Sequence, residues 1–112
     1  MNHFKVVYIS GPYRIDKEKA ILAFRKATED LWAAGFVPID PIALTCHLDG
    51  KFPDDDFIER DKELVSRCDA IFLLPGWQES EGAKVELETA HIYEMPSFES
   101  IEEIVDFFQK KS

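Results

Sequence analysis

The stretch CDAIFLLPGWQESEGAKVELETA, residues 68–90, indicates how the rest of the chain is organised. Its apolar run from Ala70 to Leu74 predicts a buried strand, the Pro-Gly pair predicts a turn, and a helix is expected to begin near Ser80. Ligands of open α/β sheets bind where a strand leads through such a loop into a helix N-terminus, because backbone N–H groups and the helix dipole converge there. We therefore expect the chain to build a site around this loop.

Strands and helices are predicted to alternate along the chain. Strands are expected at residues 4–9, 36–39 and 70–74, with a weaker signal at 96–98. Helices are expected between Asp16 and Gly35, over 56–67, from Ser80 to Met95, and after a capping box at Ser100, while 40–53 reads as a loop with one helical turn. Since each crossover is a helix, the pattern predicts a single-domain α/β protein, a flavodoxin- or Rossmann-like three-layer sandwich with a short parallel sheet of four or five strands.

The composition argues against several classes of function. The 112 residues carry 13 Lys and Arg against 22 Asp and Glu, a net charge of −9 that would repel a nucleic-acid polymer. We find no signal-peptide pattern and no apolar run near the roughly 20 residues that span a bilayer, so we expect a soluble, cytoplasmic protein with no membrane partner. The cysteines, Cys46 and Cys68, and the histidines lack metal-ligand spacing, so no metal and no cofactor is expected.

Asp61 lies on the apolar side of the helix predicted at 56–67. The apolar positions 57, 58, 64, 65 and 68 share one face, and position 61 falls in its middle. A buried carboxylate lowers stability unless it is paired or hydrogen-bonded, so such an acid is more often functional than accidental. The alternative is an aspartate at the margin of the stripe that pairs with a neighbouring arginine.

Glu86 lies on the face of its helix that carries the smallest side chains. Gly82, Ala83 and Ala90 share that face, and small residues would let a ligand approach while Glu86 reaches towards it. The alternative is a surface glutamate, because acids are common in this helix. Two carboxylates at one cleft suit glycosidic chemistry, in which one attacks or stabilises an oxocarbenium-like centre and the other assists proton transfer.

Four motifs, in this order and spacing, resemble the nucleoside 2-deoxyribosyltransferase superfamily and its small DUF4406-like branch. They are YISGPYR at 8–14, RD at 60–61, CDAIFLLPGW at 68–77 and SEGAKVE at 80–86. The resemblance implies cleavage or exchange of the N-glycosidic bond of a 2′-deoxynucleotide, by a deoxynucleoside 5′-monophosphate N-glycosidase or a deoxyribosyltransferase. Its partner would be a small-molecule nucleoside or nucleotide.

The resemblance also implies three catalytic roles. Glu86 matches the family's nucleophile, which attacks the anomeric carbon and forms a covalent glycosyl-enzyme. Tyr8 matches a tyrosine whose hydroxyl orients that glutamate. Asp61 matches an acidic residue that contacts the sugar or base and assists proton transfer.

Further residues are candidates for substrate binding: Ser10, Gly11, Arg14, Trp77, Ser80 and Gly82. Ser80 stands where the free-nucleoside transferases have an acid and the 5′-monophosphate glycosidases have a serine, so the resemblance implies a phosphate cradle with Gly11 and Arg14. The alternatives are a plain N-cap for Ser80 and a surface position for Arg14. Trp77 is expected to stack on a base, with closure of the loop over the core as its alternative.

Two other functions stay open at this point. A non-catalytic nucleotide-binding or sensing module on the same scaffold would not need both carboxylates at its ligand. A phosphoribohydrolase of the lysine-decarboxylase-like group would have a PGGxGTxxE loop, whereas residues 75–86 read PGWQESEGAKVE. The resemblance and the small size also predict a homo-oligomer, a dimer or larger. The base, and the choice between hydrolysis and transfer, are not determined.

Overall fold

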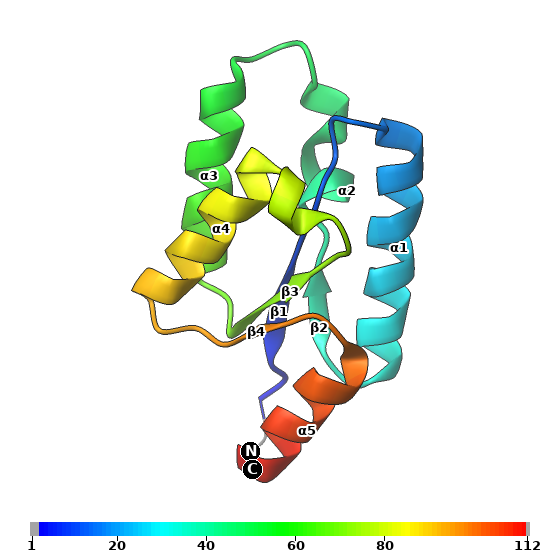
Figure 1. The fold of residues 1–112 in the computed structure, drawn as a ribbon, viewed down its shortest axis with the longest axis vertical. Coiled ribbons are helices and arrows are strands. Elements are labelled where there is room, and N and C mark those ends of the chain that lie inside the picture. Colours follow the sequence, from blue (N-terminus) through cyan, green and yellow to red (C-terminus); the bar gives the residue numbers. More distant parts are fainter. Residues whose placement is uncertain (1–2, 112) are drawn as a thin grey trace.

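The computed structural model describes residues 3–111, and its strands and helices alternate along the chain (Figure 1). The strands are β1 (Val6–Ser10), β2 (Val37–Ile39), β3 (Ala70–Leu73) and β4 (Ser97–Phe98). The α-helices are α1 (Lys17–Ala33), α2 (Pro41–Thr45), α3 (Asp54–Ser66), α4 (Glu81–Ile92) and α5 (Ile101–Lys111). Two 3-10 turns lie at η1 (Cys46–Leu48) and η2 (Trp77–Glu79).

The sheet has four strands in the order β2-β1-β3-β4, and all of its pairs are parallel. The two central strands, VVYIS in β1 and AIFL in β3, are mostly apolar, as expected of strands that are covered on both faces. Asp69 sets where they begin to pair, because its Oδ2 accepts the Val6 N–H at 2.7 Å and its own N–H donates to the Val6 carbonyl at 2.7 Å. The predicted parallel sheet of four strands is confirmed.

Successive side chains of β1 and β3 point to opposite faces of the sheet, and each face has its own core. The core under α1 and α5 includes Val7, Ile9, Phe24, Leu31, Phe72 and Ile104. The core under α3 and α4 includes Tyr8, Val65, Ile71, Leu73 and Ala90. Burying a large apolar side chain stabilises the fold by about 1.5–3 kcal/mol, so each core holds its helices on the sheet. The predicted three-layer sandwich is confirmed, and Figure 1 shows α1 on one side of the sheet and α3 and α4 on the other.

Residues 41–48 are more helical than predicted. Asp40 is the N-cap of α2, and its Oδ1 accepts the N–H groups of Ile42 at 3.0 Å and Ala43 at 3.1 Å. Pro41 occupies the first helical position, where its fixed φ suits the helix and its missing N–H removes no bond. The Asp-Pro pair is therefore the local signal for the start of this helix, which the prediction of a loop with one helical turn did not use.

The helix α4 is shorter than predicted, because it ends at Ile92 and not near Met95. Glu94 adopts a left-handed backbone with φ of 57°, which cannot continue the helix. The Met95 N–H donates a hydrogen bond to the Ala90 carbonyl at 2.8 Å. This hydrogen bond ends the helix, and the chain then leads into β4.

The strand order leaves a crevice at the carboxyl ends of β1 and β3. The chain leaves β1 towards α1 on one face of the sheet and leaves β3 towards α4 on the other. Loops that diverge in this way from neighbouring parallel strands leave space between them, and this is where open α/β sheets bind ligands. Within residues 3–111, no helix is both long and apolar enough to cross a lipid bilayer.

Candidate active site

A pocket of about 420 Å³ occupies this crevice. It is lined by residues 11–15 after β1, by the segment from Pro41 to Asp49, by the first two turns of α3, and by residues 79–86 around the start of α4. Pockets of about 300–1,000 Å³ are typical of small-molecule sites. The size is therefore that of a small-molecule site.

Glu86 lies half-buried in this pocket, with one hydrogen bond to each carboxylate oxygen. The Tyr8 hydroxyl donates to Oε2 at 2.7 Å, and the Ser10 hydroxyl donates to Oε1 at 2.6 Å. Both donors come from β1, two positions apart, so the alternation of the strand puts them on the face that α4 covers. The strand and the helix together fix the orientation of this carboxylate.

Burial shifts the pKa values of both Glu86 and Tyr8 upwards, and for Glu86 the two hydrogen bonds oppose that shift. Burial raises the pKa of Glu86 to about 7, the bonds from Ser10 and Tyr8 act to lower it, and the negative charge of Asp61 adds to the rise. Burial, with the charge of Glu86, also raises the pKa of Tyr8 well above its usual value near 10. The tyrosine therefore stays protonated and keeps its role as a donor, while Glu86 titrates near neutrality.

Asp61 reaches the same pocket from α3 and is half-buried. Burial raises its pKa to about 6. The neighbouring Arg60 pairs with Asp56 at 3.8 Å, and we find no hydrogen bond or ion pair to Asp61 anywhere in residues 3–111. Asp61 therefore does not pair with a neighbouring arginine, which was the alternative to a functional role. Two carboxylates therefore face one cavity, and the charge of Asp61 contributes to the raised pKa of Glu86.

The start of α4 forms another wall of the pocket. Ser80 is the N-cap of this helix, and its Oγ accepts the Ala83 N–H at 3.2 Å. Ser80, Gly82 and Ala83 line the pocket beside Glu86, whereas Ala90, on the same predicted face as Gly82 and Ala83, is buried in the core under α3 and α4. Ser80 thus acts as a cap and also faces the cavity.

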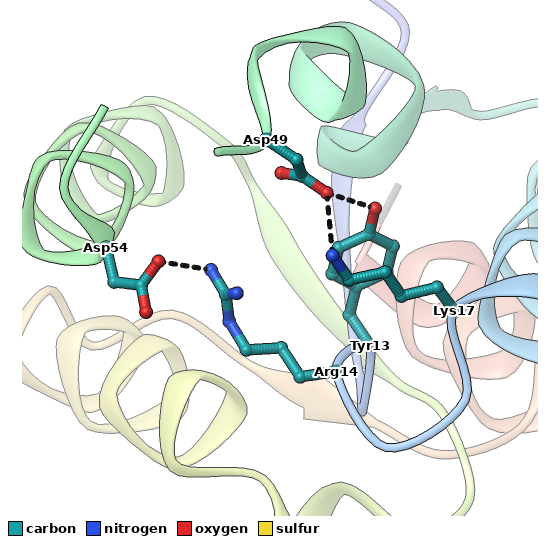
Figure 2. Close-up of polar contacts among 5 residues, drawn as sticks. All are labelled: Tyr13, Arg14, Lys17, Asp49 and Asp54. Carbon is teal, nitrogen blue, oxygen red and sulfur yellow. Dashed lines mark hydrogen bonds and ion pairs between the residues drawn. The ribbon is translucent and has the colours of Figure 1, made fainter. Parts of the chain in front are cut away.

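Polar pairs join residues 13–17 to the segment before α3 and to the start of α3, and Figure 2 shows them. Arg14 Nη2 lies 2.8 Å from Asp54 Oδ1. The Tyr13 hydroxyl donates to Asp49 Oδ2 at 2.5 Å, and Lys17 Nζ lies 3.5 Å from the same oxygen. Burial and the bond to Asp49 raise the pKa of Tyr13 to about 12, so this hydroxyl also stays a donor.

Several of these residues were not predicted from the sequence. Tyr13, Asp49 and Asp54 line the pocket, but no periodicity or spacing marks a loop aspartate as the partner of a distant tyrosine or arginine. Of the predicted binding residues, Gly11, Arg14, Ser80 and Gly82 line the pocket. Ser10 was also predicted to bind substrate, but it does not line the pocket. Its hydroxyl is buried and donates a hydrogen bond that orients Glu86.

Trp77 lies away from the pocket. Its ring packs against the core under α3 and α4, and its Nε1–H donates to Glu99 Oε1 at 3.1 Å. The expected stacking of Trp77 on a base has no support in this geometry, because the η2 turn directs the ring to the core. The position of Trp77 matches the alternative, in which the ring closes the loop over the core.

The described residues contain no cluster of three or more His, Cys, Asp or Glu side chains placed to hold a metal ion. What the pocket offers is a carboxylate oriented by two hydroxyl groups and a second, half-buried carboxylate. Such a set can support nucleophilic attack and proton transfer.

Residues 5–97 match the model of a protein family whose description is "Domain of unknown function (DUF4406)". The matched range contains every residue that lines the pocket, from Gly11 to Glu86. No curated protein matches the chain.

Proposed function

The chain belongs to the DUF4406 family, and we propose that its pocket cleaves or exchanges the N-glycosidic bond of a 2′-deoxynucleotide through a covalent glycosyl-enzyme on Glu86. The observation that carries the proposal is the environment of Glu86, which is oriented through both oxygens by Tyr8 and Ser10 and opens on a pocket that Asp61 also lines. The resemblance to the nucleoside 2-deoxyribosyltransferase superfamily supports the same two carboxylates and the same tyrosine.

In the first step, a Glu86 oxygen attacks the anomeric carbon of the sugar. A carboxylate offers about four lone-pair positions, and the bonds from Tyr8 and Ser10 take two of them, so a lone pair remains for attack. The new bond joins that oxygen to C1′, the bond from C1′ to the base nitrogen breaks, and its electron pair leaves with the base. A proton then reaches the base nitrogen. We assign its supply to Asp61, whose pKa burial raises to about 6, so the protonated fraction of Asp61 grows as the pH falls towards 6.

In the second step, an acceptor attacks C1′ from the opposite face and releases Glu86 as a carboxylate. Water as acceptor gives hydrolysis, and the nitrogen of a second base gives transfer. Asp61, now ionised, takes the proton that the acceptor loses. Two successive displacements restore the starting configuration at C1′, so we expect a transfer product with retained stereochemistry.

The first test is product analysis. The protein is incubated with each deoxynucleoside and with each 5′-monophosphate, with and without a free acceptor base, and the products are separated by chromatography. The proposal expects release or exchange of the base from at least one substrate. Stabilisation of the protein by a nucleotide with no product from any substrate would contradict it and would favour the binding or sensing module.

The second test assigns the roles. Glu86→Gln keeps the shape of the side chain and should abolish turnover, whereas Glu88→Gln, on the exposed face of the same helix, should leave it unchanged. Asp61→Asn should lower the rate by about 100-fold or more, the usual contribution of a general acid or base. Mass spectrometry of acid-quenched protein should find one deoxyribosyl group on the peptide that contains Glu86. Base release that survives Glu86→Gln would refute the mechanism.

The predicted homo-oligomer and the preference between a nucleoside and its monophosphate belong to this proposal too. Sedimentation in the analytical ultracentrifuge distinguishes a dimer or larger assembly from a 12.9 kDa monomer. The substrate comparison above measures the preference directly.

A further inference from the structure

Arg14 is the single cationic side chain among the described residues that line the pocket. Six carboxylates share this lining: Asp49, Asp54, Asp61, Glu79, Glu81 and Glu86. A negatively charged ligand group would therefore meet a field of its own sign unless a local cation offsets it. Among the side chains of the pocket lining, only Arg14 can supply that cation, so its availability bears directly on the binding of such a group.

Arg14 already has a partner. Its side chain extends from the first loop to the start of α3, where Nη2 lies 2.8 Å from Asp54 Oδ1 (Figure 2). The two side chains are 56% and 68% exposed, so the pair is solvated and can exchange partners. An anionic group at this rim would have to draw the guanidinium from Asp54 or share it, and it would also be repelled by the Asp54 charge.

We propose that Asp54 determines how strongly this pocket discriminates between a substrate with a 5′-phosphate and one with a free 5′-hydroxyl, because it competes with the phosphate for Arg14. The inference rests on the proposed function. A guanidinium binds a phosphate through two parallel N–H bonds, so loss of either edge to Asp54 weakens that contact. A neutral 5′-hydroxyl neither competes with Asp54 nor is repelled by it, so its binding is independent of the pair.

The test compares Asp54→Asn with Asp55→Asn. Both substitutions remove one negative charge from the first turn of α3, but Asp55 makes no ion pair within residues 3–111. The readout is kcat/KM for a deoxynucleoside and for its 5′-monophosphate. An exposed ion pair of this kind changes an equilibrium by up to about fivefold. We expect Asp54→Asn to raise the ratio of monophosphate to nucleoside activity by about fivefold and Asp55→Asn to change it by less than about twofold.

A second pair of variants ties the effect to Arg14. In an Arg14→Gln background, no guanidinium remains to be released and only the direct repulsion by Asp54 is lost, so Asp54→Asn should raise the ratio by less than about twofold, as Asp55→Asn does. Asp54→Ser repeats the test with a different helix-compatible residue in case Asp54→Asn alters the fold. Equal changes in the Asp54 and Asp55 variants, or a rise of about fivefold that persists without Arg14, would overturn the inference.

A binding measurement separates this inference from the proposed activity. Isothermal titration of deoxyribose 5-phosphate and of deoxyribose requires no turnover. Asp54→Asn should bind the phosphate about fivefold more tightly than the unmodified protein and should bind deoxyribose equally. If no substrate releases its base, the proposed activity fails while this comparison still tests Asp54. If the phosphate binds both proteins equally, the inference about Asp54 fails whatever the activity is.

Discussion

Replacing Glu86 with glutamine should stabilise the protein at alkaline pH, even though it removes the proposed nucleophile. The substitution keeps the volume of the side chain and a hydrogen bond to each neighbour, because the amide oxygen accepts from Tyr8 and the amide N–H₂ donates to Ser10. What it removes is a charge in a partly buried site. The expected gain in stability therefore depends on pH.

The size of the gain follows from the pKa of Glu86. Burial raises this pKa from 4.5 to about 7, so between these values the folded protein binds a proton that the unfolded chain has lost. The free energy of unfolding then falls as the pH rises through this window, by 1.36 kcal/mol per pKa unit or about 3 kcal/mol in total. Glu86→Gln avoids this loss. Its advantage should be about 3 kcal/mol at pH 8, less than about 1 kcal/mol at pH 5, and about 10 °C in Tm at the higher pH.

Urea unfolding followed by circular dichroism at about pH 5, 6, 7 and 8 measures this advantage directly. Glu88→Gln is the matched control, because it makes the same change of residue at an exposed position of the same helix and should not reproduce the advantage of about 3 kcal/mol at pH 8. An advantage of Glu86→Gln that is equal at all four pH values would refute the reasoning, and so would a less stable variant at pH 8. Neither result depends on catalysis.

Three further predictions concern the site and the loop that borders it. Tyr8→Phe removes one hydrogen bond to a carboxylate, a contact worth about 1.5–3 kcal/mol, so the pKa of Glu86 and the acidic limb of the pH–rate profile should move up by about one to two units; an unchanged profile would contradict this. Gly11→Ala should destabilise the protein by about 1–3 kcal/mol in urea unfolding, since the new Cβ would lie 2.8 Å from Leu74 Cβ. Gly82→Ala, in a helix where the nearest atom to the new Cβ is Ser80 Oγ at 4.0 Å, should instead stabilise it by up to about 1 kcal/mol.

The elements that the sequence predicted best are those with complete local signals. Ser100 and Glu103 form the predicted capping box, with Ser100 Oγ accepting the Glu103 N–H at 3.2 Å and donating to its carboxylate at 3.1 Å. The central strands were predicted within one or two residues, because their apolar runs end at Gly or Pro. The segment 41–48 was predicted with only one helical turn, because its helix is short and its signal is one capping aspartate followed by a proline.

In the candidate site, too, the residues with a clear local signal were predicted and those without one were not. Glu86 and Asp61 stood out because each places a carboxylate on a face whose other residues are small or apolar, and both line the pocket. The role of each in catalysis stays a prediction. Trp77 was read from its residue type alone, and an indole near a turn can pack against the core as readily as it faces a ligand.

The sequence by itself determined the alternation of strands and helices and the two carboxylates on unusual faces, because periodicity, caps and turns are properties of neighbouring residues. Only the tertiary structure decided which polar groups meet around the pocket. Tyr13 and Asp49 are separated by 36 positions, and Arg14 and Asp54 by 40. These pairs form because the sheet order places the loop after β1 opposite the start of α3, and no local pattern encodes that distance. The same packing directs Tyr8 and Ser10 from one strand onto Glu86, which makes a glutamate among many in its helix the centre of the site.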